Sequence, residues 1–181
     1  MSKNSFNNRI IRAAKLDPNL YEEVEADKSA LGQAMAIVVF SSIAAGIGLY
    51  KTGGFSGIIT GTMASLIGWY VWAYLTYFIG TKFLPEPQTQ ADLGELLRTI
   101  GFSSSPGLLR VFYFVPGIGG LLYLISSLWM LVAMIIAVRQ ALDYNSTLRA
   151  VGVCVIGYII QIFVLVVLFS IFGGVVPEAT P

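Results

Sequence analysis

The sequence predicts an all-α fold: a polytopic membrane helix bundle with five transmembrane helices and short amphipathic helices at its amino terminus. Composition supports this class, because 56% of the 181 residues are hydrophobic and only 12% are charged, as is typical of membrane proteins. Long uncharged runs support it too. At 1.5 Å per residue, a run of about 20 residues crosses a hydrocarbon core of about 30 Å.

Residues 1–29 form the predicted cytosolic or interfacial head, which is basic first and then acidic. In residues 6–16, a helical period places Arg9, Arg12 and Lys15 opposite Phe6 and Ile10, as expected of a short helix lying on the membrane surface. Basic residues beside a membrane favour contact with anionic lipid. The alternative is an unstructured basic tail, since so short a helix is marginal in isolation.

The acidic part of the head, residues 17–27, is predicted to be a second helix. Asp17 is a suitable N-cap, and Pro18 fits the first helical turn. Glu22 and Glu23 lie early in this helix, where negative charge suits the helix dipole. The helix is expected to be either a solvated lead into the bilayer or a docking surface for a soluble partner.

The membrane domain, residues 30–173, follows the head, and residues 174–181 form a short tail. We expect five spans, at about residues 30–50, 57–80, 92–115, 121–140 and 151–172. With the amino terminus inside the cell, all of the 11 lysines and arginines except Lys51 and Arg110 fall on the inside. This bias predicts a multi-pass protein of the cytoplasmic membrane with its carboxyl terminus outside. A re-entrant hairpin at residues 102–115 fits the bias less well.

The third span is the least regular part of the chain. Asp92 and Glu95 have the spacing of a capping box at its start. Pro106 is predicted to break it, because proline removes a backbone hydrogen bond. Pro116 and Gly117 mark a second break.

A polar group accompanies the first break. The hydroxyls of Ser103, Ser104 and Ser105 can satisfy the freed carbonyls. Arg110 is the only charge well inside a span, so we expect either a lipid or anion contact formed with these serines, or an arginine that snorkels to the headgroups.

The second span carries two further patterns. Small residues recur every fourth position, at Gly53, Gly57, Gly61 and Ser65, which predicts a face for close helix packing. Its second half is rich in aromatic residues, more than an interfacial belt needs. The candidates for an interface with another chain, or for the bundle interior, are Trp69, Trp72, Tyr74 and Tyr77.

Catalytic and ligand-binding chemistry is sparse. There is no histidine and a single cysteine, Cys154, so we expect no metal site, no cofactor and no enzymatic activity. No acid lies within a span, which disfavours an ion-coupled pump. The basic stretch is too short and too mixed for nucleic-acid binding. At the exit of the fourth span, Arg139 and Asp143 are four residues apart and are expected to pair.

The order of these segments resembles the YIP (Ypt/Rab-interacting protein) family of five-span membrane proteins. The resemblance is carried by the acidic lead YEEVEADKSALGQA, by the amphipathic DLGELLRTIGFSSSP, and by the close spacing of the spans. Eukaryotic members are associated with Rab-type GTPases, vesicle traffic and the shaping of secretory membranes. This chain has a shorter head without a clear match to their head-region motif and is more similar to prokaryotic members. A Rab-type partner is therefore not carried over.

These observations predict a non-enzymatic membrane protein that organises membranes or membrane-protein partners, including copies of itself. One alternative is a lipid or small-anion conduit built on the broken third span. A second is an accessory subunit of a larger membrane complex.

Overall fold

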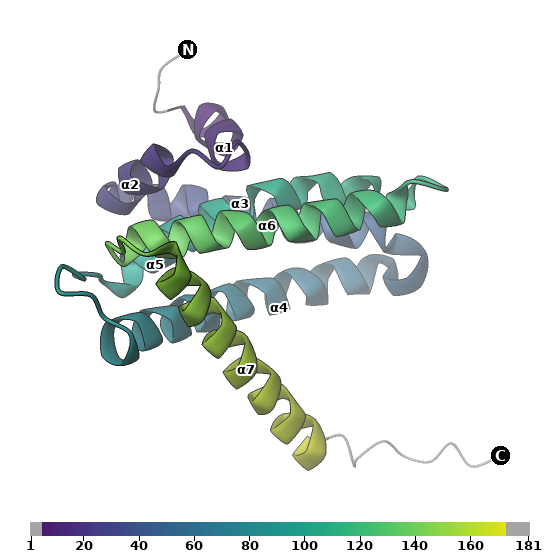
Figure 1. Ribbon diagram of the computed structural model, residues 1–181. Coiled ribbons are helices and arrows are strands. Elements are labelled where there is room, and N and C mark those ends of the chain that lie inside the picture. Colours follow the sequence, from purple (N-terminus) through teal and green to yellow (C-terminus); the bar gives the residue numbers. More distant parts are fainter. Residues whose placement is uncertain (1–4, 173–181) are drawn as a thin grey trace.

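The computed structural model describes residues 5–172, which are helical almost throughout and contain no strand (Figure 1). The predicted tail, residues 174–181, lies outside the described residues. The all-α membrane helix bundle is confirmed. The elements in chain order are α1 (Phe6–Ala14), α2 (Pro18–Ala26), η1 (Lys28–Ala30), α3 (Leu31–Gly48), α4 (Tyr50–Phe78), η2 (Ile79–Phe83), α5 (Leu93–Ser103), η3 (Ser105–Phe114), α6 (Gly119–Ala141) and α7 (Thr147–Phe172).

Four helical segments within the described chain are long and apolar enough to cross a membrane. They cover Lys28–Gly48, Gly53–Phe83, Gly119–Ala141 and Thr147–Val164, in the regions predicted for the first, second, fourth and fifth spans. The third predicted span is built differently. It consists of the α-helix α5 and the 3-10 helix η3, which meet at Ser104, so the chain breaks beside Pro106.

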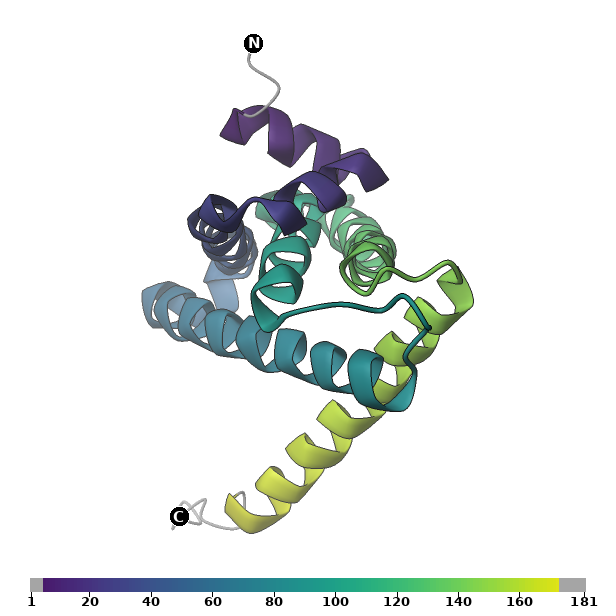
Figure 2. The ribbon, with the colours of Figure 1, turned by 90° about the vertical axis from the view of Figure 1, so that its left-hand side faces the viewer.

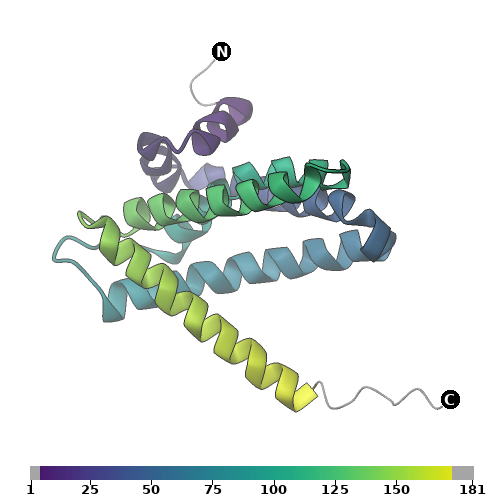
Figure 3. The same cartoon turned by 45° about the vertical axis from the view of Figure 1, so that its right-hand side comes forward.

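Helices α3, η3 and α6 run side by side, and α4 lies along one face of this group (Figure 1). Helix α5 crosses between α3, α4 and α6 at the end of the bundle that carries the head (Figure 2). Helix α7 packs on α6 and η2 near its start and then leads away obliquely (Figure 3). The bundle is therefore closed at the head end and more open at the other.

Two hydrophobic clusters hold the head end together. One joins α4, α5, α6 and the first turns of α7. The other joins the head to the membrane helices, with Leu20, Tyr21 and Val24 of α2 packed in one cluster with Phe102 and Ala137. All five of these side chains are fully buried, so the head shares its core with the bundle.

The helix starts follow the local sequence signals. The Asp17 carboxylate accepts a hydrogen bond from the Asn19 amide and caps α2, with Pro18 in its first turn. The predicted capping box of α5 is also formed. The Glu95 amide donates to Asp92 at 2.8 Å, and the Asp92 amide donates to the Glu95 carboxylate at 2.7 Å. These two bonds satisfy backbone donors that the first helical turn leaves free.

The pairing predicted between Arg139 and Asp143 is wrong. Helix α6 ends at Ala141, and Asp143 has a positive φ of 54°, so the two residues no longer share a helical turn. Arg139 instead donates to the backbone oxygens of Tyr144 and Asn145.

Candidate functional site

The break in the third span is stabilised by the serines that precede Pro106. Proline has no N–H to offer the carbonyl four residues back, which here belongs to Phe102. The Ser105 hydroxyl donates to that oxygen at 2.7 Å, and the Ser103 hydroxyl donates to Ile100 O, also at 2.7 Å. Two of the three predicted hydroxyls, those of Ser103 and Ser105, therefore bond local carbonyls, and the chain continues as η3.

Helix η3 places Arg110 against α6. Its Nη2 donates to Ser127 Oγ at 3.0 Å, and the guanidinium carbon lies 4.9 Å from the centre of the Tyr123 ring. The Ser127 hydroxyl in turn donates to the Tyr123 carbonyl. A cation over an aromatic face is attracted by the ring quadrupole. Arg110 is therefore held among the helices rather than extended along the outside of the bundle.

Arg110 borders a cavity of about 650 Å³ between α3, α4, α5, η3, α6 and α7. Ser103 and Ser104 also line it, whereas the predicted partner Ser105 does not. No aspartate or glutamate is among the described residues that line the cavity. The polar side chains in the lining are Ser41, Ser42, Ser65, Trp69, Trp72, Ser103, Ser104, Arg110, Ser127, Tyr158 and Gln161.

The glycine stripe of α4 forms one wall of this cavity. Gly53, Gly57, Gly61 and Ser65 all line it. A Cβ added at any of these three glycines has no other atom within 4 Å, apart from neighbours along its own helix. Within the described chain, no helix therefore packs on the stripe. The predicted packing role stays a prediction, and it requires a helix from outside the described chain.

The tight helix contacts use other glycines. An added Cβ at Gly101 of α5 would lie 2.7 Å from Ala34 Cβ of α3. At Gly48 it would meet the backbone oxygen of Arg110, and at Gly107 it would meet Ser41 Oγ. These glycines allow α3 to approach α5 and η3 closely.

The four candidate aromatic residues of α4 separate into two groups. Trp69, Trp72 and Tyr77 face the bundle. Trp69 donates to Leu97 O at 3.1 Å, and Trp72 and Tyr77 belong to the cluster at the head end. Tyr74 instead faces outward with half of its surface exposed.

The second predicted break forms the turn between η3 and α6. Gly117 has a φ of 85°, a left-handed conformation that glycine adopts readily. Pro116 and Gly117 border a separate pocket of about 450 Å³ with Lys51 and Tyr113. This pocket lies at the end of the bundle away from the head.

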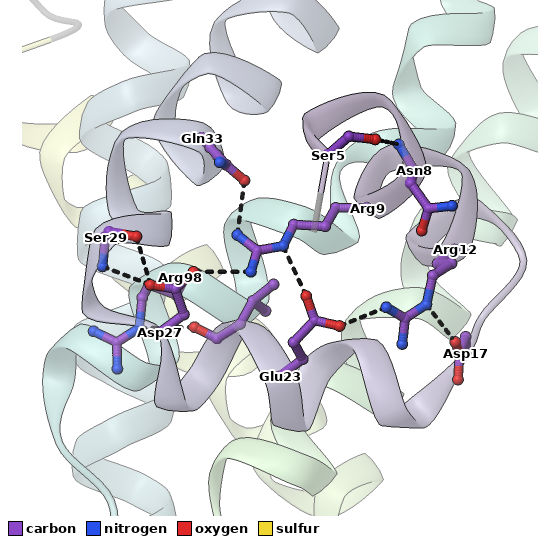
Figure 4. Close-up of polar contacts among 11 residues, drawn as sticks. Ser5, Asn8, Arg9, Arg12, Asp17, Glu23, Asp27, Ser29, Gln33 and Arg98 are labelled. Atoms are coloured by element: carbon purple, nitrogen blue, oxygen red, sulfur yellow. Dashed lines mark hydrogen bonds and ion pairs between the residues drawn. The ribbon is translucent and has the colours of Figure 1, made fainter. Parts of the chain in front are cut away.

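The head contains a chain of ion pairs (Figure 4). Arg9, whose side chain is only 3% exposed, contacts Glu23 at 2.9 Å and Asp27 at 2.8 Å. Arg12 contacts Glu23 at 2.5 Å and Asp17 at 2.8 Å. Two of the basic side chains expected to meet anionic lipid are therefore paired with the acidic helix α2.

Several carboxyl groups in and beside α2 have pKa values that are shifted in two directions. The hydrogen bond from Arg12 holds the pKa of Asp17 below its usual value. Burial raises the pKa of Glu25 to about 8, and the negative charges of Glu95 and Asp143 add to this effect. Glu25 Oε2 is buried and has no hydrogen-bond partner among the described residues. The neutral form of this carboxyl group is therefore favoured in the folded chain.

Sequence reasoning identified Arg110 and the serines but missed the residues that orient Arg110. Ser127 and Tyr123 lie on the next span, and the only available signal was a serine inside an apolar run. It also missed the buried Arg9. Opposite charges in adjacent segments of the head were the signal for that contact.

Comparison with known proteins gives a family match. A family model described as the Yip1 domain matches residues 17–169. This range includes every residue that lines the cavity beside Arg110. No curated protein and no solved structure matches the chain.

Proposed function

The chain belongs to the Yip1-domain family of membrane proteins, and we propose that it organises membrane-protein partners or copies of itself without catalysing a reaction. The observation that supports this role best is an outward aromatic stripe on α4, formed by Tyr70, Tyr74 and Phe78. These side chains are 52%, 50% and 41% exposed. Tyr74 and Phe78 stack with their ring centres 6.4 Å apart.

The depth of the stripe argues for a protein partner. At 1.5 Å per residue, Tyr70 and Tyr74 lie about 18 and about 12 Å from Lys82 at the head-side end of the helix. Neither hydroxyl has a hydrogen bond within the described chain. A phenol exposed to hydrocarbon lacks a partner at this depth, whereas a neighbouring helix offers acceptors.

A photo-crosslinking residue at Tyr74 tests the proposal in intact cells. The matched control is the same residue at Leu128, which is 56% exposed on α6. We expect a product of defined mass, containing a second copy or another membrane protein, from position 74 and much less from position 128. A pure monomer in mild detergent, with no crosslinked product at position 74, would refute the proposal. It would also refute the accessory-subunit alternative.

A non-enzymatic role is supported by the inventory of reactive groups. The sequence has no histidine, and the described residues hold no group of three or more His, Cys, Asp or Glu side chains that could bind a metal. The single cysteine, Cys154, is buried. A reproducible turnover by the purified protein would contradict this assignment.

We also propose that the head lies on the cytoplasmic face of the cell membrane. The loops that contain Glu86 and Asn145 bond to each other at the head end. Of the basic residues in the described chain, Lys51 and Arg110 lie towards the opposite end, where Arg110 approaches Gly48. This distribution agrees with the positive-inside rule. A cysteine introduced at Lys15 tests the orientation. Its labelling by an impermeant thiol reagent is compared between whole cells and inverted vesicles.

The cavity supports a lipid or anion conduit as a second candidate function. A cavity that reaches a cationic side chain within the bundle is what such a conduit requires. Reconstituted vesicles measure the flux of labelled phospholipid and of small anions directly. We expect Arg110→Ala to abolish that flux while the protein still folds, and no flux from the unsubstituted protein would remove this candidate.

A further inference from the structure

Two residues that line the cavity beside Arg110 carry a buried hydrogen-bond donor that has no partner among the described residues. Arg110 Nε and Trp72 Nε1 are both buried and unbonded among the described residues. Trp72 is only 7% exposed, and both residues line the cavity. Buried polar groups are almost always hydrogen-bonded, so two free donors at one cavity indicate a ligand that supplies acceptor atoms.

Charge narrows the class of ligand. Arg110 is the only charged side chain among the described residues of the lining. A guanidinium inside a membrane bundle normally pairs with an anion or with backbone carbonyls, and the contacts described for Arg110 are to a serine hydroxyl and an aromatic ring. An arginine without a counter-ion matches a phosphate or carboxylate group.

Further hydroxyl groups in the lining suit the same ligand. Ser41 is only 5% exposed and, like Ser65, makes no hydrogen bond among the described residues. Ser42, Ser103 and Ser127 are engaged locally, because their hydroxyls donate to backbone carbonyls. Ser41 and Ser65 are therefore free to donate to an anion.

Size and the remaining surface favour an amphiphile over a bare ion. A volume of about 650 Å³ lies in the range of pockets that hold whole organic ligands, about 300 to 1,000 Å³. The rest of the lining is apolar and includes Val38, Leu49, Met130, Leu131 and Met134. The glycine stripe keeps one part of the α4 wall free of side chains, which leaves room for aliphatic chains.

We propose that this cavity binds the phosphate-bearing headgroup of a membrane phospholipid, with Arg110 donating to the phosphate oxygens and Trp72 donating to another oxygen of the same lipid. The apolar lining receives the first part of the acyl chains. This site does not depend on the organising role, since it needs no partner protein. It is also distinct from conduction, because a lipid can bind without crossing.

Native mass spectrometry of the full chain in detergent tests the site, with short-chain phosphatidylglycerol as the titrated probe. Inorganic phosphate and a short-chain diacylglycerol serve as competitors, since each carries one part of the predicted ligand. We expect one phosphatidylglycerol per chain and weak competition by either fragment. If inorganic phosphate competed for the site as strongly as the lipid does, the lipid would not be the source of the phosphate group.

Substitutions locate the site. Arg110→Gln should weaken binding at least about tenfold and Trp72→Phe about fivefold, as expected for a charge-assisted and a neutral hydrogen bond. Gly57→Leu with Gly61→Leu should abolish binding by filling the cavity. The control is Gly32→Leu, because Gly32 also has open space around an added Cβ but does not line the cavity.

Two further results would overturn the proposal. One is unchanged affinity in Arg110→Gln or in the Gly57 and Gly61 variant, with each variant shown to be folded by its elution volume and its thermal unfolding. The other is an efficient crosslink from position 57 to a second copy, which would place a protein helix in the cavity. The crosslink at Tyr74 is read independently, so failure of the lipid site and failure of the organising role are distinguishable.

Discussion

Replacing Gly101 by alanine should destabilise the bundle, because α5 and α3 contact each other through this glycine. The added Cβ would lie 2.7 Å from Ala34 Cβ and 3.1 Å from the Ala34 backbone. Carbon atoms in contact prefer about 3.5 to 4.0 Å, so the two helices must separate by about 1 Å. Overpacking of this kind typically costs about 1 to 3 kcal/mol.

A gain in helix propensity offsets part of that cost. Alanine is favoured over glycine by up to about 1 kcal/mol within a helix, so we expect Gly101→Ala to lower the free energy of unfolding by about 1 to 2 kcal/mol. Gly61→Ala is the matched control, because its Cβ has no other atom within 4 Å beyond its own helix. It should leave stability unchanged or slightly raised.

Reversible unfolding in mixed micelles, at a low protein concentration that keeps the chain monomeric, measures both free energies. Wild-type stability in Gly101→Ala would refute the close approach of α3 and α5. A loss in Gly61→Ala as large as in Gly101→Ala would contradict the open space around the glycine stripe.

The remaining predictions concern the head and the break in the third span. Arg9→Gln leaves two carboxylates of α2 without their buried partner and should destabilise the docked head by about 2 to 4 kcal/mol, seen as faster amide exchange in α1 and α2 but not in α6. Glu25 has a pKa of about 8 against an ordinary value of 4.5, so the folded chain should lose stability as the pH rises through this interval, because only the unfolded chain ionises freely. Glu25→Gln should remove about 1 to 2 kcal/mol of that loss at pH 8. A difference between the unfolding free energies of the wild type and Glu25→Gln that persists below pH 4.5 would contradict this account. Ser105→Ala removes the hydroxyl that donates to the Phe102 carbonyl and should cost about 1 to 3 kcal/mol, whereas Ser104→Ala should cost little by the same unfolding assay.

Local signals in the sequence were sufficient for the helix starts and for the break. Asp92 and Glu95 form the predicted capping box, and Ser105 bonds the carbonyl that Pro106 leaves free. Both features depend on residues within four positions of each other. Spacing along one helix therefore determines the geometry directly.

Contacts between helices could not be predicted in the same way. Helices in lipid are apolar on all sides, so periodicity does not reveal which face meets a neighbour. The regular stripe at Gly53, Gly57 and Gly61 lies open, whereas the isolated Gly101 and Gly107 make the close contacts. The direction of the Arg110 side chain also depends on its bond to Ser127, which belongs to a helix that follows it in the chain.

The 3-10 geometry of η3 sets how the predicted third span would match the thickness of the bilayer. Its ten residues, Ser105–Phe114, rise about 20 Å at 2.0 Å per residue, whereas an α-helix of the same length would rise about 15 Å. This difference of about 5 Å equals the spread in hydrocarbon thickness between thin and thick cell membranes. Rewinding η3 would shorten the span and rotate Arg110 about the helix axis, which couples the position of this side chain to hydrophobic mismatch.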